Sequence, residues 1–402
     1  TGGPGRPGAG PLMADAMSKR AALLRLLYYP DDLLARREAE ALRDLGFAVE
    51  VFCLRNHGEP ADDCVDGVRV RRLPLRREKR GAARNLYEYL AFFTLAAVSL
   101  TVAHLRRPFA VIQVNTMPDF LVFATLIPRL LGAKVALMMY EPMPELWATK
   151  FRSPLPSAIL RLIARWSVRY AHAVITVTEP LKETLVRYGV DPRKITVVLT
   201  APDPRLFGRA AEPRAAARDG TFTVICHGAI EERYGHDTLV AALAALRERL
   251  PGLRLVITGD GGYRDEFLAL VTAHALQDRI RYLGYVPLPD LVEALRQADA
   301  GVVAQKASPY SHLVHTGKMY DYLEFGLPVL ASRLKAVQAY FDEASLAYFE
   351  PGDPDDLARA ITELATCPER RQALRENSQR LYRQYQWAHQ RDVYASVYRA
   401  WL

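Results

Sequence analysis

Short apolar runs alternate with amphipathic stretches along the second half of the chain, and several of the runs end in glycine. The runs have the length of buried strands, and the stretches between them have the length of helices. Strands that alternate with helices in this way predict parallel βαβ units and a doubly wound sheet. The predicted strands are 222–228, 253–262, 279–286 and 300–305, and the predicted helices are 236–250, 265–276 and 288–298.

The first half of the chain shows the same alternation. An apolar run at 22–29 is followed by a helical pattern, a glycine turn and a second apolar run, which is the start of another Rossmann-like domain. The loop at 30–35 has no glycine, so it is not a dinucleotide-binding fingerprint. Thr178 is the predicted N-cap of a later helix, ahead of Pro180. A chain of 402 residues is too long for one core, and we expect two domains.

The most informative segment is 315–332. It predicts a helix that begins near Thr316 and Gly317 and ends at a Gly-Leu-Pro breaker, with a buried strand behind it. Lys318 adds a positive charge at the helix N-terminus, and Asp321 lies one turn further on the same side. Lys318 and the helix end could hold a phosphate, and the Asp321 carboxylate could hold a ribose diol. The alternative is an ordinary core helix with a charged first turn.

Five further motifs accompany this segment in a fixed order between residues 220 and 385. Along this stretch stand HGAIEERYG, ITGDGG, LGYVP, ADAGVVA, GKMYDYLEFGLPVLAS and FEPGDPDDLARAI. This set resembles the donor-binding half of a bacterial family 4 glycosyltransferase of the GT-B fold. The first half resembles the same family in RREAEAL, MPDF and ITVTEPLKE. The resemblance implies an α/β protein whose two Rossmann-like, doubly wound domains face each other across a cleft.

On this basis the chain divides into four parts. Residues 1–19 are rich in Gly, Pro and Ala and lack the apolar stretch of a signal peptide, so they are predicted to be a disordered leader. Residues 20–205 form the expected acceptor-binding domain, and residues 206–385 form the expected nucleotide-sugar-binding domain. The resemblance implies that the C-terminal helix, residues 386–402, crosses back to the first domain.

The resemblance also assigns roles on the donor side. Asp321 falls on the second Glu of the family's E-x7-E motif, which binds the ribose, while the first Glu has no acidic counterpart here. Lys318 takes a phosphate role, and Arg233 is the nearest match to a second basic group, unless it is only a surface arginine on a turn. Tyr285 could stack on the base or simply pack. The implied donor-binding residues are Gly228, Gly259, Asp260, Gly284, Tyr285, Val286, His315, Thr316, Gly317 and Asp321.

The first domain departs from the family near the reacting centre. Relatives carry His-Asp where this chain has Tyr140 and Glu141, and tyrosine does not titrate near neutral pH. We keep both as candidate catalytic residues beside Lys318 and Arg233. Glu145 is a candidate for contacts to the acceptor sugar. Glu141 and Glu145 could instead be loop residues that cap the backbone or are simply solvated.

Two arginines occupy an unfavourable place. Arg36 and Arg37 lie in a first helical turn, where the helix dipole disfavours cations. A residue that breaks a local rule often has a ligand, so both are candidates for a phosphate or acceptor contact. Alternatively they pair with Asp31 or Asp32.

The net charge of +8 is unevenly distributed. Between Arg69 and Arg84 stand eight Arg or Lys residues and one acid, and no formal charge follows from Tyr89 to Leu105. This combination is typical of a helix lying on an anionic membrane, and the run is short for a span of roughly 20 apolar residues. The alternative is a buried helix beside a solvated basic loop. Nucleic acid is not expected, because the cluster lacks interleaved aromatics and no reader module is present.

The resemblance implies that the protein is a hexosyltransferase. The donor would be a nucleotide diphosphate sugar, UDP in preference to GDP, and the acceptor a lipid-linked molecule or glycan of cell-surface polysaccharide or glycolipid synthesis. The resemblance implies retention of anomeric configuration, and neither a metal nor another cofactor is expected. Four cysteines without pairing or metal spacing fit the cytoplasm, with the protein peripheral on the inner face of the cell membrane. The alternatives are a nucleotide-sugar 2-epimerase of the same fold and a non-catalytic GT-B binding protein.

Overall fold

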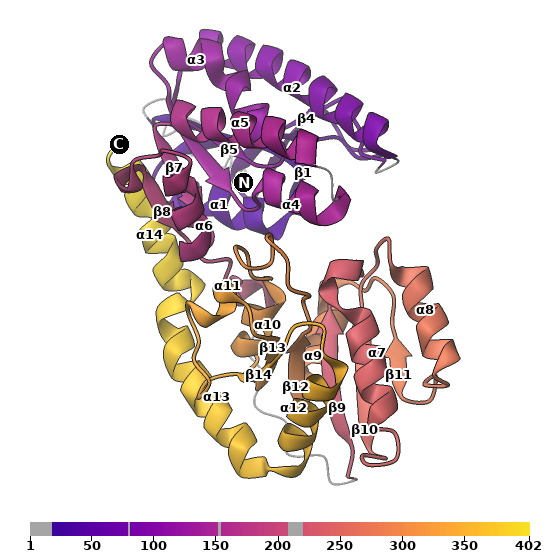
Figure 1. The fold of residues 1–402 in the computed structure, drawn as a ribbon. Helices are drawn as coiled ribbons and strands as arrows, with labels where there is room; N and C mark the ends of the chain where they lie inside the picture. Colours follow the sequence, from indigo (N-terminus) through magenta and orange to yellow (C-terminus); the bar gives the residue numbers. More distant parts are fainter. Residues whose placement is uncertain (1–17, 79–80, 152–153, 208–219) are drawn as a thin grey trace, which may run out of the picture.

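A computed structural model describes residues 18–402 except 79–80, 152–153 and 208–219, and it contains two α/β domains stacked one above the other (Figure 1). Nearly all of the predicted leader, and most of the stretch at the predicted domain boundary, therefore lies outside the described residues. The first domain carries the N-terminal strands and the second carries the predicted donor-binding segments. The expected arrangement of two Rossmann-like domains is confirmed.

The first domain is built on an eight-stranded sheet in the order β3-β4-β2-β1-β5-β6-β7-β8. Its neighbouring strands are parallel, except for the antiparallel hairpin of β3 and β4 at one edge. The strands are β1 (Arg20–Tyr28), β2 (Ala48–Leu54), β3 (Asp62–Val65), β4 (Val68–Leu73), β5 (Phe109–Asn115), β6 (Lys134–Met139), β7 (Ala173–Thr176) and β8 (Ile195–Val197). The helices are α1 (Leu33–Asp44), α2 (Gly81–Arg106), α3 (Leu126–Leu130), α4 (Met143–Phe151), α5 (Pro154–Tyr170) and α6 (Glu179–Arg187), with a 3₁₀ helix η2 (Asp119–Thr125).

The second domain has a six-stranded, all-parallel sheet in the order β11-β10-β9-β12-β13-β14. Its chain runs outward from β9 to β11 and then crosses to β12, so the strand order reverses beside β9, where doubly wound sheets bind ligands. The strands are β9 (Phe222–His227), β10 (Leu253–Thr258), β11 (Ile280–Tyr282), β12 (Ala300–Val303), β13 (Val329–Ser332) and β14 (Ala347–Phe349). The helices are α7 (His236–Ala245), α8 (Arg264–Ala273), α9 (Leu288–Gln297), α10 (Lys318–Glu324), α11 (Lys335–Gln338), α12 (Pro354–Thr366), α13 (Pro368–Tyr382) and α14 (Trp387–Arg399).

Side-chain N-caps determine where several helices begin. The Thr178 side chain accepts a hydrogen bond from the backbone N–H of Leu181, which confirms the predicted N-cap of α6. Asp32 caps α1 and Asp353 caps α12 in the same way. Each cap satisfies backbone donors that the first turn of a helix leaves free.

The last helix, α14, returns to the first domain (Figure 1). Trp387, Tyr394 and Tyr398 are buried in that domain's core. The Tyr394 hydroxyl donates to Oε1 of Gln113 on β5 at 2.5 Å. The Arg37 guanidinium lies 4.2 Å from the centre of the Trp387 ring and donates to the Ala201 carbonyl. Arg37 therefore connects α1 both to the segment after β8, which contains Ala201, and to α14.

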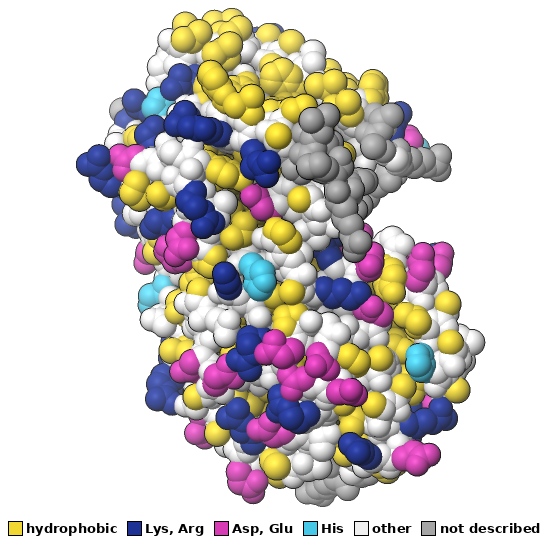
Figure 2. Space-filling model, in the orientation of Figure 1, with side chains coloured by type: hydrophobic (Ala, Val, Ile, Leu, Met, Phe, Trp, Pro, Cys, Tyr) yellow, Lys and Arg dark blue, Asp and Glu magenta, His cyan; other side chains and the backbone are white. Residues whose placement is uncertain are grey.

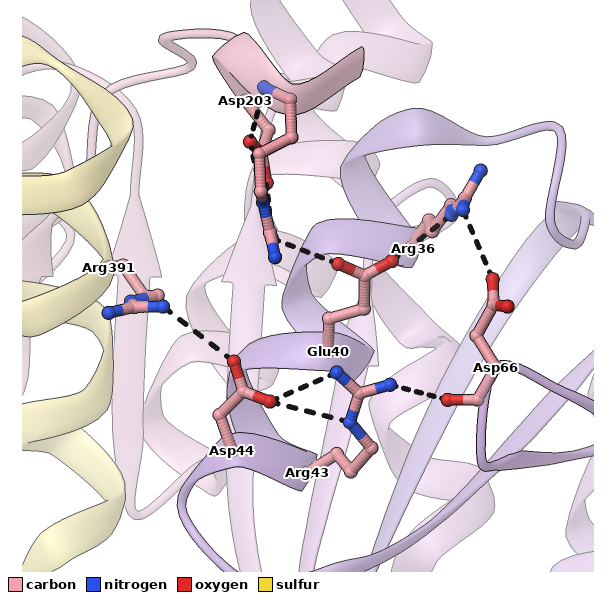
Figure 3. Close-up of polar contacts among 8 residues, drawn as sticks. Arg36, Glu40, Arg43, Asp44, Asp66, Asp203 and Arg391 are labelled. Carbon is pink, nitrogen blue, oxygen red and sulfur yellow. Dashed lines mark hydrogen bonds and ion pairs between the residues drawn. The ribbon is translucent and has the colours of Figure 1, made fainter.

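Arg36 is also held within the protein. Its guanidinium lies 3.1 Å from Glu40 and 3.1 Å from Asp66, in the ion-pair network of Figure 3. The same network reaches Arg205, whose guanidinium lies 3.0 Å from Glu40. Neither pair is the one the sequence suggested, because Asp32 instead faces Arg25 at 2.6 Å. The positive charge of Arg36 is met by carboxylates from its own helix and from the turn between β3 and β4.

The alternative of a solvated basic loop after residue 69 needs correction. Its first part is strand β4, which pairs with β2 on one side and with β3 on the other. Arg72 is buried and faces Asp63 and Glu59, at 3.0 and 3.3 Å. Arg71 pairs with the buried Glu50. The part of this positive charge at Arg71 and Arg72 is therefore neutralised inside the first domain, while residues 79 and 80 of the basic run lie outside the described residues.

Candidate active site

Two glycine turns form the floor of the candidate site, where β9 and β10 end. A Cβ atom on Gly259 would lie 1.9 Å from the Gly228 carbonyl oxygen, and Gly259 has φ +132°, so only glycine fits there. The Gly259 N–H donates to the Gly284 carbonyl at 2.7 Å, which joins the third turn to the first two. The structure thus brings together Gly228, Gly259 and Gly284, as expected of turns at one edge of a parallel sheet.

The Lys318 side chain lies directly over this floor. A Cβ atom on Gly228 would lie 3.4 Å from Lys318 Cε, so the glycine leaves room for the lysine. Lys318 Nζ stands 4.8 Å from the centre of the Tyr234 ring, and the residue is 8% exposed. In the part of the chain that the structure describes, no carboxylate pairs with this ammonium. A buried cation without a counter-ion is costly, and a bound anion would relieve that cost.

Asp321 lies one turn beyond Lys318. Its Oδ2 atom stands 3.3 Å from Nε2 of His227, the last residue of β9. The His227 ring packs edge-on against Tyr322, with ring centres 5.2 Å apart. The side chain of Asp321 is 18% exposed, so the carboxylate is positioned by the histidine and still reachable. Helix α10 has seven residues, so Lys318 supplies more positive charge here than the helix dipole does.

Arg233 adds a second cation from the turn after β9. Its guanidinium lies 3.5 Å from Glu231 and 4.7 Å from the centre of the Tyr234 ring. Burial lowers the pKa of Arg233, but Tyr234, Tyr310 and Glu231 nearby raise it overall. Both Arg233 and Lys318 therefore flank Tyr234, and the Arg233 guanidinium stays charged at neutral pH.

Tyr310, which belongs to the second domain, connects this part of the site to the first domain. It is buried, and its hydroxyl donates to Oε1 of Glu141 at 2.8 Å, across the two domains. A second link follows shortly, because the Thr178 hydroxyl donates to the Leu313 carbonyl. Glu141 is therefore held on the first-domain side of Tyr310.

Several buried polar atoms nearby have no hydrogen-bond partner among the described residues. They include Oγ1 of Thr316, Oγ1 of Thr200 and both amide atoms of Gln305, which follows β12. A Cβ atom on Gly317 would lie 4.0 Å from the Thr200 hydroxyl. Buried polar groups are normally paired, so a cluster of such atoms at a strand edge is typical of a ligand site.

The predicted base-reading segment lies beside the turns. Tyr285 is 85% exposed, so its ring is not a packing element of the domain. Val286 is half-buried, and Asp260 lies 3.5 Å from Arg264 with its side chain largely exposed. His315 is buried and its Nε2 atom lies 3.1 Å from the Tyr320 hydroxyl, so its ring is engaged within the domain.

Tyr140 is placed differently from the expectation. The residue is 7% exposed, and its hydroxyl donates to the buried Glu38. Glu38 also accepts from Gln113 and Asn115 at 2.8 and 2.7 Å, and burial raises its pKa. The Tyr140 hydroxyl is therefore used inside the first domain, which argues against a contact to a donor sugar.

A second carboxyl group lies near Glu145. One oxygen of Glu145 accepts from the Tyr188 hydroxyl at 2.6 Å, while its other oxygen has no partner among the described residues. Asp119, at the start of η2, is fully buried, and within the same residues neither of its oxygens has a partner. Burial, and secondarily the charge of Glu145, raises the pKa of Asp119 to about 8. Asp119 is thus mostly protonated at neutral pH.

Asp119→Asn should flatten the dependence of stability on pH. The unfolded carboxyl loses its proton near 3.8 and the folded one near 8, so the folded state binds more protons between these values. Wild-type stability should therefore fall as pH rises through this range, by about 1.4 kcal/mol per pH unit from this group. Urea unfolding at several pH values measures the slope, with exposed Asp290→Asn as the control. Equal slopes in wild type and Asp119→Asn would contradict the assignment.

Among the described residues, no group of three or more His, Cys, Asp or Glu side chains is arranged to hold a metal ion. Independence from metal stays a prediction for this chain.

Two family models match the chain side by side. The model described as Glycosyl transferases group 1 matches residues 209–381, and the model described as Glycosyl transferase 4-like domain matches residues 34–201. The chain belongs to the glycosyltransferases of the GT-B type. The boundary between the matches falls where the two sheets meet in the sequence, and the group 1 match contains Lys318 and Asp321.

Relatives and solved structures agree with this assignment. A glycogen synthase of Mycobacterium tuberculosis is 24% identical over 59% of this chain and 56% of its own length, so the chain spans about half of that relative. A 2-deoxystreptamine glucosyltransferase of Streptomyces kanamyceticus is 24% identical over 83% of this chain and 88% of its own length. The fold matches sucrose-phosphate synthase from Thermosynechococcus elongatus with a TM-score of 0.76 at 19% identity, covering 95% and 98% of the two chains. It also matches Anabaena HepE in complex with UDP-glucose, with a TM-score of 0.70 at 16% identity, covering 95% and 99%.

Sequence reasoning missed part of the candidate site. Tyr234, Tyr310 and His227 were not among the candidates. His227 had a visible signal, since it stands directly before the glycine that ends an apolar strand. Tyr310 had none, because its partner Glu141 comes from the other domain.

Proposed function

We propose that the chain transfers a sugar from a nucleotide diphosphate donor to a lipid-linked or glycan acceptor. The observation that carries this proposal is Lys318, a buried ammonium over the glycine floor with no carboxylate partner among the described residues. A nucleoside diphosphate would suit this sheet edge, with its phosphates on Lys318 and Arg233 and its ribose hydroxyls on Asp321. UDP is favoured over GDP because a similar fold, HepE, is described in complex with UDP and with UDP-glucose.

The proposed chemistry is departure of the nucleotide diphosphate from the anomeric carbon. Negative charge then grows on the leaving phosphate, and Lys318 and Arg233 are already positioned to stabilise it without rearranging. Asp321 would hold the ribose, and Tyr285 would stack on the base. Glu141, held by Tyr310, would accept hydrogen bonds from hydroxyl groups of the transferred sugar. Retention of configuration and independence from metal are part of the proposal on the strength of the family alone.

The test is a screen of the protein against UDP- and GDP-sugars, with a membrane extract as the source of acceptor. The expected result is release of UDP that depends on the extract, together with label transferred from the sugar. Recovery of an epimerised nucleotide-sugar without transfer would instead identify a 2-epimerase. Binding of UDP with neither product would identify a non-catalytic binding protein.

A further inference from the structure

The outer surface of helix α2 is apolar, although it faces away from the core. One stripe of this helix, Phe92, Ala96, Leu100 and Ala103, is buried in the core of the first domain. A surface helix normally carries charged residues opposite such a stripe. Here the exposed large side chains are Leu86, Tyr87, Leu90, Val98, Val102 and Leu105.

Two further helices extend this surface. The segment of α3 and the residue after it exposes Leu126, Ile127, Leu130 and Leu131, and α5 exposes Ile159, Leu162 and Trp166. Helix α2 packs against α3 and against η2, which α5 also contacts. Thirteen of the eighteen exposed large hydrophobic residues among the described residues lie on these helices or directly after α3. Figure 2 shows yellow side chains over the top of the molecule, where Figure 1 places α2 and α3. We name this surface the apolar face.

The exposed charges on the same helices are positive. Arg165 and Arg169 stand on one side of α5 with Leu162 and Trp166, because positions i, i+3, i+4 and i+7 share a helix face. The sequences of α2, α3 and α5 contain a single acid, Glu88, which is fully buried and lies 3.0 Å from Arg84. Dark blue Lys and Arg side chains border the yellow area in Figure 2.

The geometry excludes the simplest membrane role, a span formed by α2 as it is folded here. Arg84–Arg106 is long and apolar enough to cross a bilayer by length and composition, and only 28% of its most apolar window is buried. Its buried stripe, however, belongs to the core of the first domain. The helix therefore lies along the domain and offers one side outward.

We propose that the apolar face is a docking surface for an anionic lipid bilayer. Apolar side chains with tryptophan and tyrosine among them, and exposed charges of one positive sign, match the acyl boundary and the anionic headgroups of such a surface. If the proposed function also holds, a docked protein meets its lipid-linked acceptor at the bilayer.

Co-sedimentation with vesicles tests the proposal. Wild-type protein should bind phosphatidylcholine vesicles that contain phosphatidylglycerol, and high salt should weaken but not abolish binding. The double variant Arg165→Gln, Arg169→Gln should lower the partition coefficient about tenfold or more, because each basic residue near such a surface contributes about one kcal/mol. The variant Leu105→Gln, Leu130→Gln, Trp166→Gln should remove the salt-resistant part. These side chains are 64%, 73% and 63% exposed, so folding should be unaffected.

Matched controls separate docking from general charge or hydrophobicity. Arg249→Gln, Arg281→Gln makes the same charge change at exposed sites of the second domain, and Val186→Gln, Val393→Gln removes exposed apolar groups elsewhere. Both controls should bind vesicles like wild type. UDP affinity, measured in solution, should be the same in all variants, so failure of the proposed function would leave this test intact. The proposal would be overturned if wild-type protein stays in the supernatant at low salt. It would also be overturned if sedimentation equilibrium shows that the wild-type protein is a dimer and that the apolar triple variant is a monomer.

Discussion

Lys318→Ala is expected to lower turnover by about a hundredfold to a thousandfold, with a much smaller rise in the Michaelis constant for the donor. The ammonium lies over Gly228, and no ion-pair partner is described for it. Its attraction to the leaving diphosphate should grow as the bond to the sugar breaks, so its loss should appear mainly in the chemical step. Initial rates of UDP release at varied donor concentration measure both constants.

Two further variants make this test specific. Lys318→Met keeps an unbranched side chain of nearly the same length and removes the ammonium group with its charge, so it should be as slow as Lys318→Ala. Lys335→Ala removes an exposed lysine from the next helix and should behave like wild type. If the Michaelis constant rises in Lys318→Met while turnover stays the same, Lys318 binds the donor without taking part in its activation.

The arrangement of the proposed donor side was predictable because it depends on local rules. Apolar runs that end in glycine place turns at the carboxyl edge of a parallel sheet, and Gly228 and Gly259 do meet there. A lysine and an aspartate three positions apart on a helix fall on one side, and Lys318 and Asp321 do so. These inferences need only periodicity and the direction of the chain.

The features that the sequence did not predict depend on contacts between distant segments of the chain. Tyr140 was a candidate because the resemblance places it where relatives carry histidine, but Glu38, on α1, takes its hydroxyl. The basic run after residue 69 looked free, but Glu50 and Asp63 come from β2 and β3 and neutralise part of it. Helix α2 was expected to be either interfacial or buried, and its two sides differ: one is core and the other is exposed. One-dimensional patterns do not show which carboxylate reaches which arginine.

Asp321→Ala is expected to weaken UDP binding by about tenfold to a hundredfold. The carboxylate lies beside His227, and a charged acceptor that loses its place in a partly buried hydrogen bond costs about 1.5–3 kcal/mol. Titration calorimetry measures the affinity, and thermal unfolding shows whether the fold is kept. Asp321→Glu should retain most of the affinity, since the family carries glutamate here, and exposed Asp290→Ala should retain all of it.

A nucleotide without ribose hydroxyls identifies the partner of this carboxylate. If Asp321 accepts from the ribose, wild-type protein should bind 2′,3′-dideoxy-UDP about as weakly as Asp321→Ala binds UDP, and the variant should no longer distinguish the two nucleotides. A variant that still prefers UDP by the wild-type factor would separate Asp321 from the ribose. Its role would then be to hold His227 at the end of β9, and His227→Ala should reproduce the whole loss of affinity.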